Sequence, residues 1–346
     1  ELKYVRLGWS GAKVSQICLG TWHLPPSREL DEYGVMKVDE DLALKIMRRA
    51  YDLGVNFIDT ANRYHGVQAP VDLNHVGNSE RIVGRFLRTV DRESVVVATK
   101  VRGQMAPWPN GEGLSRKHIM WQVRESLRRL GTDYIDLYQI HWPDPDTPKE
   151  ETLRALADLV RRGLVLYTGV SNHRAHDVVE FMEMSEKINF EGFVSMQERY
   201  NLVDREIEAD GRLEVARNYG LALLAYSPLA QGVLSGKYYD FKEGRWAVPE
   251  MSRASYIPEV SKRYFNERVA RVLRALKEVA DSKGVTMSQA ALAWLIRRGE
   301  DVGVTIIPIV GATKVEHVEE AVEAVEVRLS DDDMRALEEA AQQGGA

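Results

Sequence analysis

The chain has 346 residues, of which 44% are hydrophobic and 28% are charged, a balance typical of a soluble globular protein. This length suits one large α/β domain, so we predict a single domain over residues 1–346. The net charge of −6 argues against nucleic acid or an anionic membrane as the main partner. Cys18 is the only cysteine, and the opening residues lack the apolar core of a signal peptide. We therefore expect a cytoplasmic protein without disulfides.

The first predicted element is a β-hairpin, in which residues 4–7 and 14–17 flank a turn at 9–12. After it, short apolar runs alternate with amphipathic helical patterns. The runs lie at residues 15–19, 55–58, 94–99, 134–140, 164–170, 193–196, 221–225 and 302–307. Near-continuous runs of Val, Ile and Leu are typical of parallel strands that are buried on both faces.

Helices are predicted between these runs. Apolar residues recur at helical spacing over residues 42–53, 119–130 and 269–279. Ser115 is the expected N-cap of one helix, and Thr286 with Gln289 forms a capping-box pattern before another at 290–297. A glycine at the expected C-terminal cap follows four helical patterns, at Gly54, Gly131, Gly163 and Gly220.

Eight strands that alternate with helices allow a closed (β/α)8 barrel or an open doubly wound sheet. A doubly wound dinucleotide-binding sheet carries Gly-x-Gly-x-x-Gly directly after its first strand. The nearest stretch, residues 111–116, lacks the third glycine and follows a later strand. The sequence therefore predicts an α/β fold of the (β/α)8 TIM-barrel type. Two long loops, 66–77 and 228–261, follow strands, so we expect them at the C-terminal face, where barrel enzymes keep their active sites.

Polar side chains stand at the ends of three consecutive predicted strands. Asp59, Lys100 and His141 end the second, third and fourth strands and are each 41 residues from the next. Tyr64 follows Asp59 by five residues and can fold back over the same end of the barrel. Singly, each residue could be a solvated, capping or core group. Their conjunction at one face favours a catalytic site.

The chemistry of these four side chains is consistent with proton transfer. A phenol is a poor acid near pH 7, and an adjacent ammonium such as Lys100 is expected to lower the pKa of Tyr64. Asp59 would keep the lysine charged, and His141 could donate a hydrogen bond to a carbonyl oxygen. No metal site is predicted, because the other histidines lack strand-based partner ligands. Proton donation to a carbonyl requires a hydride source, which implies a bound nicotinamide.

In these residues the sequence resembles the aldo-keto reductase family, over nearly the whole chain. The pattern Asp-Thr-Ala-x-x-Tyr at 59–64 is followed by Lys100, His141, Gly-Val-Ser-Asn at 169–172 and Tyr-Ser-Pro-Leu at 226–229. Further matches lie at residues 19–22, 78–80, 141–144 and 308–311. The segment 144–152 is similar to the branch that contains bacterial and archaeal reductases and potassium-channel β subunits. The resemblance implies a barrel that uses NADPH to reduce aldehydes or small ketones to alcohols, reversibly.

The resemblance also implies a role for each matching residue. Tyr64 would be the general acid, and Lys100 and Asp59 would tune it. His141 would orient the substrate, and Tyr226 would stack on the nicotinamide ring. The residues implied to bind the carboxamide are Ser171, Asn172 and Gln197.

Two further sets of residues complete the predicted site. The other cofactor-binding residues, which line the mouth or hold the phosphates and ribose, are Gly20, Thr21, Trp22, Asp59, Ser227, Pro228, Leu229, Gly232, Lys237, Gly311, Thr313, Lys314, His317 and Glu320. The predicted substrate pocket is formed by Trp22, Tyr64, Trp108, His141 and Trp142. Loop packing is the alternative role for Trp108 and Trp142.

The segment expected to bind adenosine departs from the family pattern, which has Arg or Lys, then Arg or Gln, then Glu-Asn. This chain has Lys314, then His317, then Glu320 followed by Ala321. Lys314, the Thr313 hydroxyl and a helix N-terminus together still form a phosphate site. The sequence therefore predicts NADPH as the cofactor, with NADH as the alternative.

Two other functions are compatible with the sequence. One is a nicotinamide-binding regulatory or sensor subunit with little turnover, which an extended exposed apolar patch would favour. The other is a barrel enzyme of unrelated chemistry, which would require Tyr64 to lie away from Lys100. The predicted partner is a small carbonyl or alcohol substrate, with no nucleic acid and no membrane. Neither the particular substrate nor the oligomeric state follows from the sequence.

Overall fold

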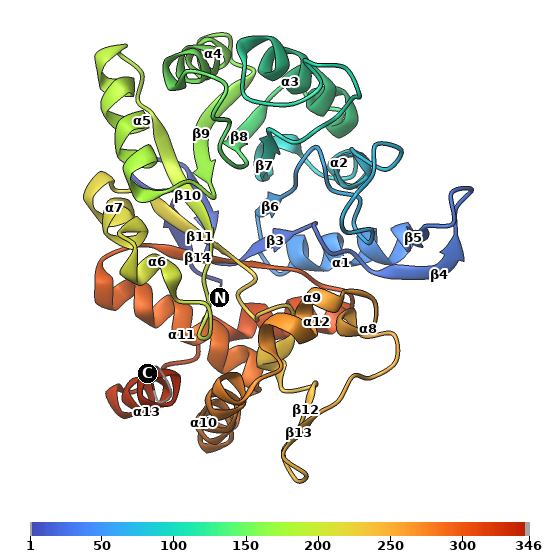
Figure 1. Ribbon diagram of the computed structural model, residues 1–346, viewed down its shortest axis with the longest axis vertical. Helices are drawn as coiled ribbons and strands as arrows, with labels where there is room; N and C mark the ends of the chain where they lie inside the picture. Colours follow the sequence, from blue (N-terminus) through green and yellow to red (C-terminus); the bar gives the residue numbers. More distant parts are fainter. Residues whose placement is uncertain (1, 343–346) are drawn as a thin grey trace.

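Eight parallel strands form a closed barrel in a computed structural model that describes residues 2–342 (Figure 1). The strands follow one another around the barrel in chain order, and the last pairs with the first. Their bounds are β3 Cys18–Gly20, β6 Phe57–Asp59, β7 Val96–Val101, β8 Ile135–Ile140, β9 Val165–Ser171, β10 Phe193–Arg199, β11 Ala222–Tyr226 and β14 Ile306–Val310. The predicted (β/α)8 barrel is confirmed, and each of the eight apolar runs contributes one strand.

The N-terminal hairpin closes one end of this barrel. It consists of β1 (Tyr4–Arg6) and β2 (Lys13–Ser15), which pair antiparallel. Leu7 and Val14 are fully buried and belong to the apolar cluster that fills the barrel interior. Gly8 has a φ of +63°, and a Cβ there would lie 2.0 Å from the Val194 carbonyl oxygen, so only glycine lets the hairpin pack this closely. The opposite, C-terminal end is therefore the open one.

The predicted run at 15–19 divides at a bend. Residues 13–15 belong to the hairpin, whereas the barrel strand β3 begins at Cys18. Cys18 is fully buried, as expected of a core residue. The division lets one segment close the barrel end and then enter the barrel wall.

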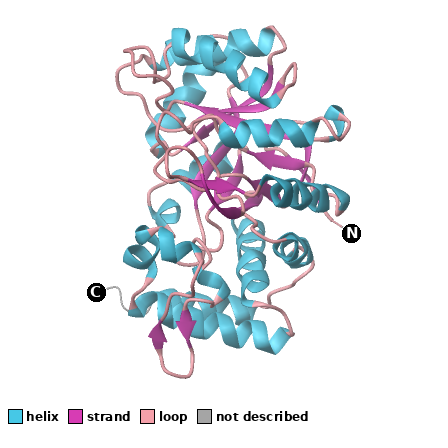
Figure 2. Cartoon of the chain, turned by 90° about the vertical axis from the view of Figure 1, so that its right-hand side faces the viewer, coloured by secondary structure: helices cyan, strands magenta, loops and turns pink. Residues whose placement is uncertain are grey.

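Helices surround the barrel, as the cartoon in Figure 2 shows. They are α1 Glu40–Asp52, α2 Asn78–Leu87, α3 Arg116–Leu130, α4 Lys149–Arg161, α5 Ala175–Lys187, α6 Glu206–Ala209, α7 Arg212–Tyr219, α10 Glu267–Lys283, α11 Met287–Val302, α12 Val315–Ala324 and α13 Asp331–Gln342. The predicted caps are present, since Ser115 accepts from the His118 N–H and Thr286 forms a capping box with Gln289. None of the helices in the described residues has the length and apolar composition needed to cross a membrane.

Two parts of the chain hold structure that the sequence did not predict. A hairpin of β4 (Pro26–Leu30) and β5 (Met36–Val38) follows the first barrel strand. The long loop after β11 folds into the 3-10 turn η2 (Val233–Ser235), the hairpin of β12 (Tyr239–Asp240) and β13 (Arg245–Trp246), and the short helices α8 (Arg253–Tyr256) and α9 (Pro258–Tyr264). A single domain over residues 1–346 stays a prediction, and residues 1 and 343–346 lie outside the described part.

The 66–77 loop is attached to the β4–β5 hairpin by a buried histidine. His75 Nδ1 lies 2.6 Å from an Asp72 oxygen, and its Nε2 lies 2.5 Å from an Asp31 oxygen. Burial opposes the imidazolium, but the two carboxylates raise the net pKa of His75. Since a neutral imidazole could donate to only one carboxylate, this contact requires the charged ring. The loop is therefore an ordered wall beside the barrel mouth.

Candidate active site

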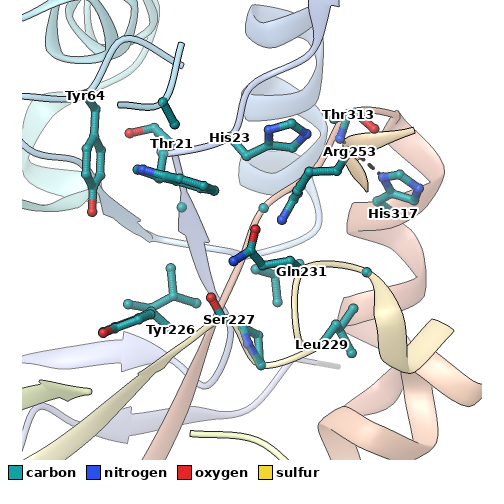
Figure 3. A pocket seen from close by; sticks show the side chains of 18 of the residues that line it. Thr21, His23, Tyr64, Tyr226, Ser227, Leu229, Gln231, Arg253, Thr313 and His317 are labelled. Carbon is teal, nitrogen blue, oxygen red and sulfur yellow. Dashed lines mark hydrogen bonds between the residues drawn. The ribbon is translucent and has the colours of Figure 1, made fainter. Parts of the chain in front are cut away.

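A cavity of about 1050 Å³ opens at the C-terminal ends of the barrel strands. Figure 3 shows it as an elongated space, with Tyr64 and Tyr226 at one end and Thr313 and His317 at the other. Loops after β3, β6, β8 and β11, together with the start of α12, form its walls. This is the face at which (β/α)8 barrels carry their active sites.

Three of the predicted catalytic groups are hydrogen-bonded to one another. Lys100 Nζ lies 2.7 Å from Asp59 Oδ2 and 2.8 Å from the Tyr64 hydroxyl. Asp59 is the last residue of β6 and Lys100 lies near the end of the neighbouring β7, so adjacent strands deliver them. The Tyr64 N–H donates to the Ala61 carbonyl, which closes a turn and brings the phenol back over the ends of the same strands. The predicted conjunction of Asp59, Lys100 and Tyr64 is thus present.

Buried amides complete the contacts of Asp59. Its Oδ1 accepts from Gln139 Nε2 at 2.9 Å and from Gln197 Nε2 at 3.0 Å. Sequence reasoning missed Gln139, which lies within β8 among apolar residues, although a glutamine inside a buried strand is itself a signal of a polar network. With Lys100 on the other oxygen, the carboxylate is hydrogen-bonded on both sides.

The charge state of Lys100 follows from its neighbours. Burial alone would lower the pKa of the fully buried ammonium, but Asp59 and Tyr64 raise it above the usual range of a lysine. Lys100 is therefore a permanent cation beside the phenol.

The pKa of Tyr64 corrects an expectation. The sequence predicted that the ammonium would lower this pKa, whereas burial raises it and outweighs the opposing effect of Lys100. The reason is that removing a phenolate from water into this deep cavity costs more free energy than the attraction of Lys100 recovers. The negative charge of Asp59 partly cancels that attraction. Tyr64 is consequently protonated throughout the neutral pH range.

His141 directly follows β8 and lies beside the phenol. The two ring centres are 5.9 Å apart. Burial, followed by the positive charges of Lys100 and Arg63, holds the pKa of His141 well below its usual range. Its Nδ1 is buried without a hydrogen-bond partner among the described residues, which favours the tautomer with the proton on Nε2, because a buried unpaired N–H is costly. His141 is thus a neutral hydrogen-bond donor.

An amide cluster surrounds the Tyr226 ring at the same end of the cavity. The Tyr226 hydroxyl donates to Asn172 Oδ1 at 2.7 Å, and Asn172 Nδ2 donates to the His141 carbonyl at 3.0 Å. The Ser171 hydroxyl donates to the Gln197 carbonyl at 2.9 Å. These bonds hold the tyrosine ring in place, with Asn172 in the left-handed region at a φ of +58°. The arrangement suits an aromatic ring and an amide between Tyr226 and Tyr64.

Positive charges gather at the far end of the cavity. Lys237, Lys314 and Arg253 line it, and none of them forms an ion pair with a carboxylate within residues 2–342. Burial, reinforced by the charges of these three cations, lowers the pKa of His317 to about 4. The Thr313 N–H donates to His317 Nδ1 at 3.2 Å, so His317 is a neutral acceptor there. Unneutralised cations in a concave site are typical of phosphate binding.

The structure brings the predicted site residues together, with one exception. The wall of this cavity contains all of the predicted cofactor-binding residues and three of the four catalytic residues. Lys100 lies just behind the wall, where it is bonded to Asp59 and Tyr64. Trp22 and Trp142 also line the cavity. The exception is Trp108, which does not contribute to the wall that the described residues form. The residue is 56% exposed, and its ring centre lies 5.8 Å from that of Trp121. Loop packing, the alternative considered from the sequence, is the role that the structure supports for Trp108.

Sequence reasoning also missed several residues that line the cavity. Arg253 and Tyr256 reach it from α8. Gln231 reaches it from the loop after β11, and Figure 3 shows Gln231 and Arg253 on the cavity wall. Arg63 lines it beside Tyr64. No local pattern marked Arg253, because only the folding of the long loop returns this residue to the barrel.

Comparison with known proteins identifies the class to which this fold and site belong. A sequence profile described as "Aldo/keto reductase family" matches residues 16–342. The chain therefore belongs to the aldo-keto reductase family.

Relatives within this family differ in what they do. The chain is 32% identical to an L-glyceraldehyde 3-phosphate reductase of Escherichia coli (strain K12), over 94% of this chain and 88% of that protein. It is 34% identical to a probable voltage-gated potassium channel subunit beta of Arabidopsis thaliana, over 94% and 92%. A solved structure of a thermostable aldo-keto reductase in complex with the inhibitor epalrestat is also similar. It has a TM-score of 0.72 and 30% identity, and the match covers 98% of this chain and 100% of that one.

Proposed function

We propose that this protein is an NADPH-dependent oxidoreductase that reduces aldehydes or small ketones to alcohols, with Tyr64 as the proton donor. The observation that carries the proposal is the Tyr64 hydroxyl 2.8 Å from Lys100, which is itself 2.7 Å from Asp59, at one end of a long cavity. A bound nicotinamide dinucleotide would supply the hydride. Several relatives are named as reductases, which supports the same reading.

The chain's own residues account for the proton. The raised pKa keeps Tyr64 protonated, so the phenol can donate to the carbonyl oxygen as negative charge develops there. Lys100 then stabilises the phenolate that is left behind, and Asp59 holds the ammonium in place. The Nε2–H of His141 would hydrogen-bond the same carbonyl oxygen and align it with the phenol.

The residues that line the cavity suit a dinucleotide phosphate. The face of Tyr226, with Ser171, Asn172 and Gln197 around it, would hold the nicotinamide and its amide. Ser227 and Lys237, on the loop after β11, would hold the pyrophosphate. Lys314 and Arg253 add charge at the far end, which favours NADPH over NADH because NADPH carries an additional phosphate.

The direct test is oxidation of NADPH at 340 nm with a panel of aldehydes and ketones, run in parallel with NADH. Turnover with NADPH supports the reductase. Tight binding of NADPH without reduction of any carbonyl in a broad panel would instead support a nicotinamide-binding regulatory subunit. One relative is named as a probable voltage-gated potassium channel subunit beta. If neither nicotinamide binds, the proposal is wrong.

We also propose a cytoplasmic location, since the only cysteine, Cys18, is a buried free thiol.

The two directions of the reaction are expected to differ in pH dependence. Reduction uses the phenol of Tyr64, whose raised pKa keeps it protonated, so kcat/KM for an aldehyde should be flat from about pH 6 to 8. Oxidation of the alcohol needs the phenolate, so its kcat/KM should rise by about tenfold per pH unit up to about pH 9. Initial rates with matched aldehyde and alcohol test this. If the oxidation rate levels off near pH 7, the pKa of Tyr64 is lowered and the effect of Lys100 on it is larger than that of burial.

Cofactor preference is expected to depend on the far cations. Changing Arg253 or Lys314 to Met should raise the Kd of NADPH by about 10- to 100-fold, because each removes a charged hydrogen-bond donor. Whichever of these two residues binds the additional phosphate of NADPH, its substitution should raise the Kd of NADH much less. Quenching of protein fluorescence during titration measures both constants. Lys242→Met, on an exposed lysine of the same long loop, is the matched control. Equal losses for both cofactors in both variants would contradict a role in discrimination.

A further inference from the structure

Arg63, the residue before Tyr64, lines the end of the cavity at which the reaction is proposed to occur. Its Nη1 donates to the Gln104 carbonyl oxygen at 2.5 Å, and its Nη2 donates to the Val71 carbonyl oxygen at 2.6 Å. These two carbonyls belong to the loop after β7 and to the 66–77 loop. The guanidinium is therefore held between two loops at the mouth of the pocket.

Close packing also fixes the position of its alkyl stem. A Cβ added to Gly103 would lie 2.4 Å from Arg63 Cδ and 3.0 Å from the Trp142 ring. Any larger residue at 103 would displace one of the two side chains. The stem thus passes over a glycine, next to a tryptophan of the pocket wall, so the direction of Arg63 is determined by the fold.

Two carboxylates, Glu112 and Asp72, act on the charge of Arg63 from nearby, but neither forms an ion pair with it. Glu112 pairs with Arg102, and Asp72 pairs with His75. Both of its hydrogen bonds go to neutral carbonyl oxygens, and no carboxylate pairs with it within residues 2–342. Three of the five guanidinium N–H groups are left over after these two bonds. Of the carboxylates that line the cavity, Asp59 is bound to Lys100, Glu250 lies on the exposed part of the long loop, and Glu320 lies on α12.

The positive charge of Arg63 lies close to the reacting centre. It is one of the charges that hold the pKa of His141 below its usual range. Arg63 itself is half-buried, so water screens its charge less than that of a surface arginine. A held, partly desolvated guanidinium with free donors is the group that binds carboxylate and phosphate oxygens most strongly in proteins.

We propose that Arg63 determines substrate class, by binding an anionic oxygen group on the carbonyl compound, a carboxylate or a phosphate, at the end away from the reacting carbonyl. This inference rests on the proposed reductase function and deepens it. Arg63 acts on substrate binding, and the proton still comes from Tyr64.

Three para-substituted benzaldehydes test the proposal, because they differ only in the group that would face Arg63. They are 4-carboxybenzaldehyde, 4-formylphenyl phosphate and the neutral methyl 4-formylbenzoate. For the wild type we expect a higher kcat/KM for at least one anionic aldehyde than for the ester, and the better of the two identifies the anion. In Arg63→Gln this anionic-to-neutral ratio should fall by about 10- to 100-fold, mostly through KM.

Two further variants separate charge from structure. Arg63→Lys keeps the positive charge but loses the planar, forked set of N–H donors. Its anionic-to-neutral ratio should therefore lie between those of Arg63→Gln and the wild type. Arg154→Gln is the matched control, because Arg154 pairs with Glu150 on the exposed face of α4 and does not line the cavity, so the ratio should not change. If Arg63→Gln does not fold, the wild-type ratio must fall with added salt for the proposal to stand.

The possible failures are distinguishable. A wild-type ratio near one, or a ratio that Arg63→Gln leaves unchanged, would overturn the inference while the reductase function stands. Absence of turnover with these three aldehydes and with every carbonyl of the broad panel would overturn the proposed function, and the inference with it.

Discussion

Replacing Tyr64 with Phe is expected to lower kcat for aldehyde reduction by about 10²- to 10⁴-fold, the usual contribution of a positioned general acid. The substitution removes one oxygen and leaves the ring against His141, so the cavity keeps its shape. The Kd of NADPH should therefore change little. Single-turnover measurements with saturating NADPH would separate the loss in the chemical step from any loss in binding.

The matched control for this variant is Tyr256→Phe. Tyr256 also lines the cavity, but its hydroxyl contacts His23 at 3.2 Å, away from the catalytic residues. Its loss should affect cofactor binding more than kcat. If Tyr64→Phe keeps most of the wild-type kcat, another group supplies the proton and the proposed mechanism is wrong.

Lys100→Met is expected to reduce both stability and activity. It leaves Asp59, which is 2% exposed, as a buried carboxylate without its cation. Breaking a buried ion pair on one side typically costs about 3–5 kcal/mol of unfolding free energy. Activity should fall by about 10²-fold or more, because nothing then stabilises the Tyr64 phenolate. Urea denaturation followed by circular dichroism measures the first effect.

A double variant and a surface control separate these contributions. Asp59→Asn added to Lys100→Met should recover part of the lost stability, since the neutral amide needs no cation, but should not recover activity. Lys277→Met removes a lysine that pairs with Asp281 on the surface at 2.8 Å, and should cost less than about 1 kcal/mol. Equal stability losses for the two lysine variants would contradict the buried-pair argument.

The barrel and its central catalytic residues were predictable from the sequence because they depend on local patterns. Apolar runs and amphipathic stripes reflect which faces must be buried, and they mark each strand and helix without reference to distant residues. Polar residues at the ends of consecutive runs, such as Asp59 and Lys100, must then meet at one end of the barrel. In the structure they are in contact, with Lys100 Nζ 2.7 Å from Asp59 Oδ2.

The features that the sequence did not reveal depend on how loops return to the barrel. Arg253 joins Lys314 at the cavity only because the long loop folds into β12, β13, α8 and α9. Trp108 leaves the pocket for a similar reason, since its loop packs it against Trp121. Loops carry no strict periodicity, so residue types alone do not indicate where their side chains lie.

By itself, then, the sequence determined the architecture, the family and the group of residues formed by Asp59, Tyr64, Lys100 and His141. Only the tertiary structure decided the direction of the Tyr64 pKa, because desolvation depends on depth in the cavity and outweighs the nearby charge of Lys100. It also decided that Arg63 is held at the pocket mouth by two carbonyls from separate loops and forms no ion pair within residues 2–342. Strand order follows from local burial, whereas charge state and substrate contacts follow from distances that only the folded chain defines.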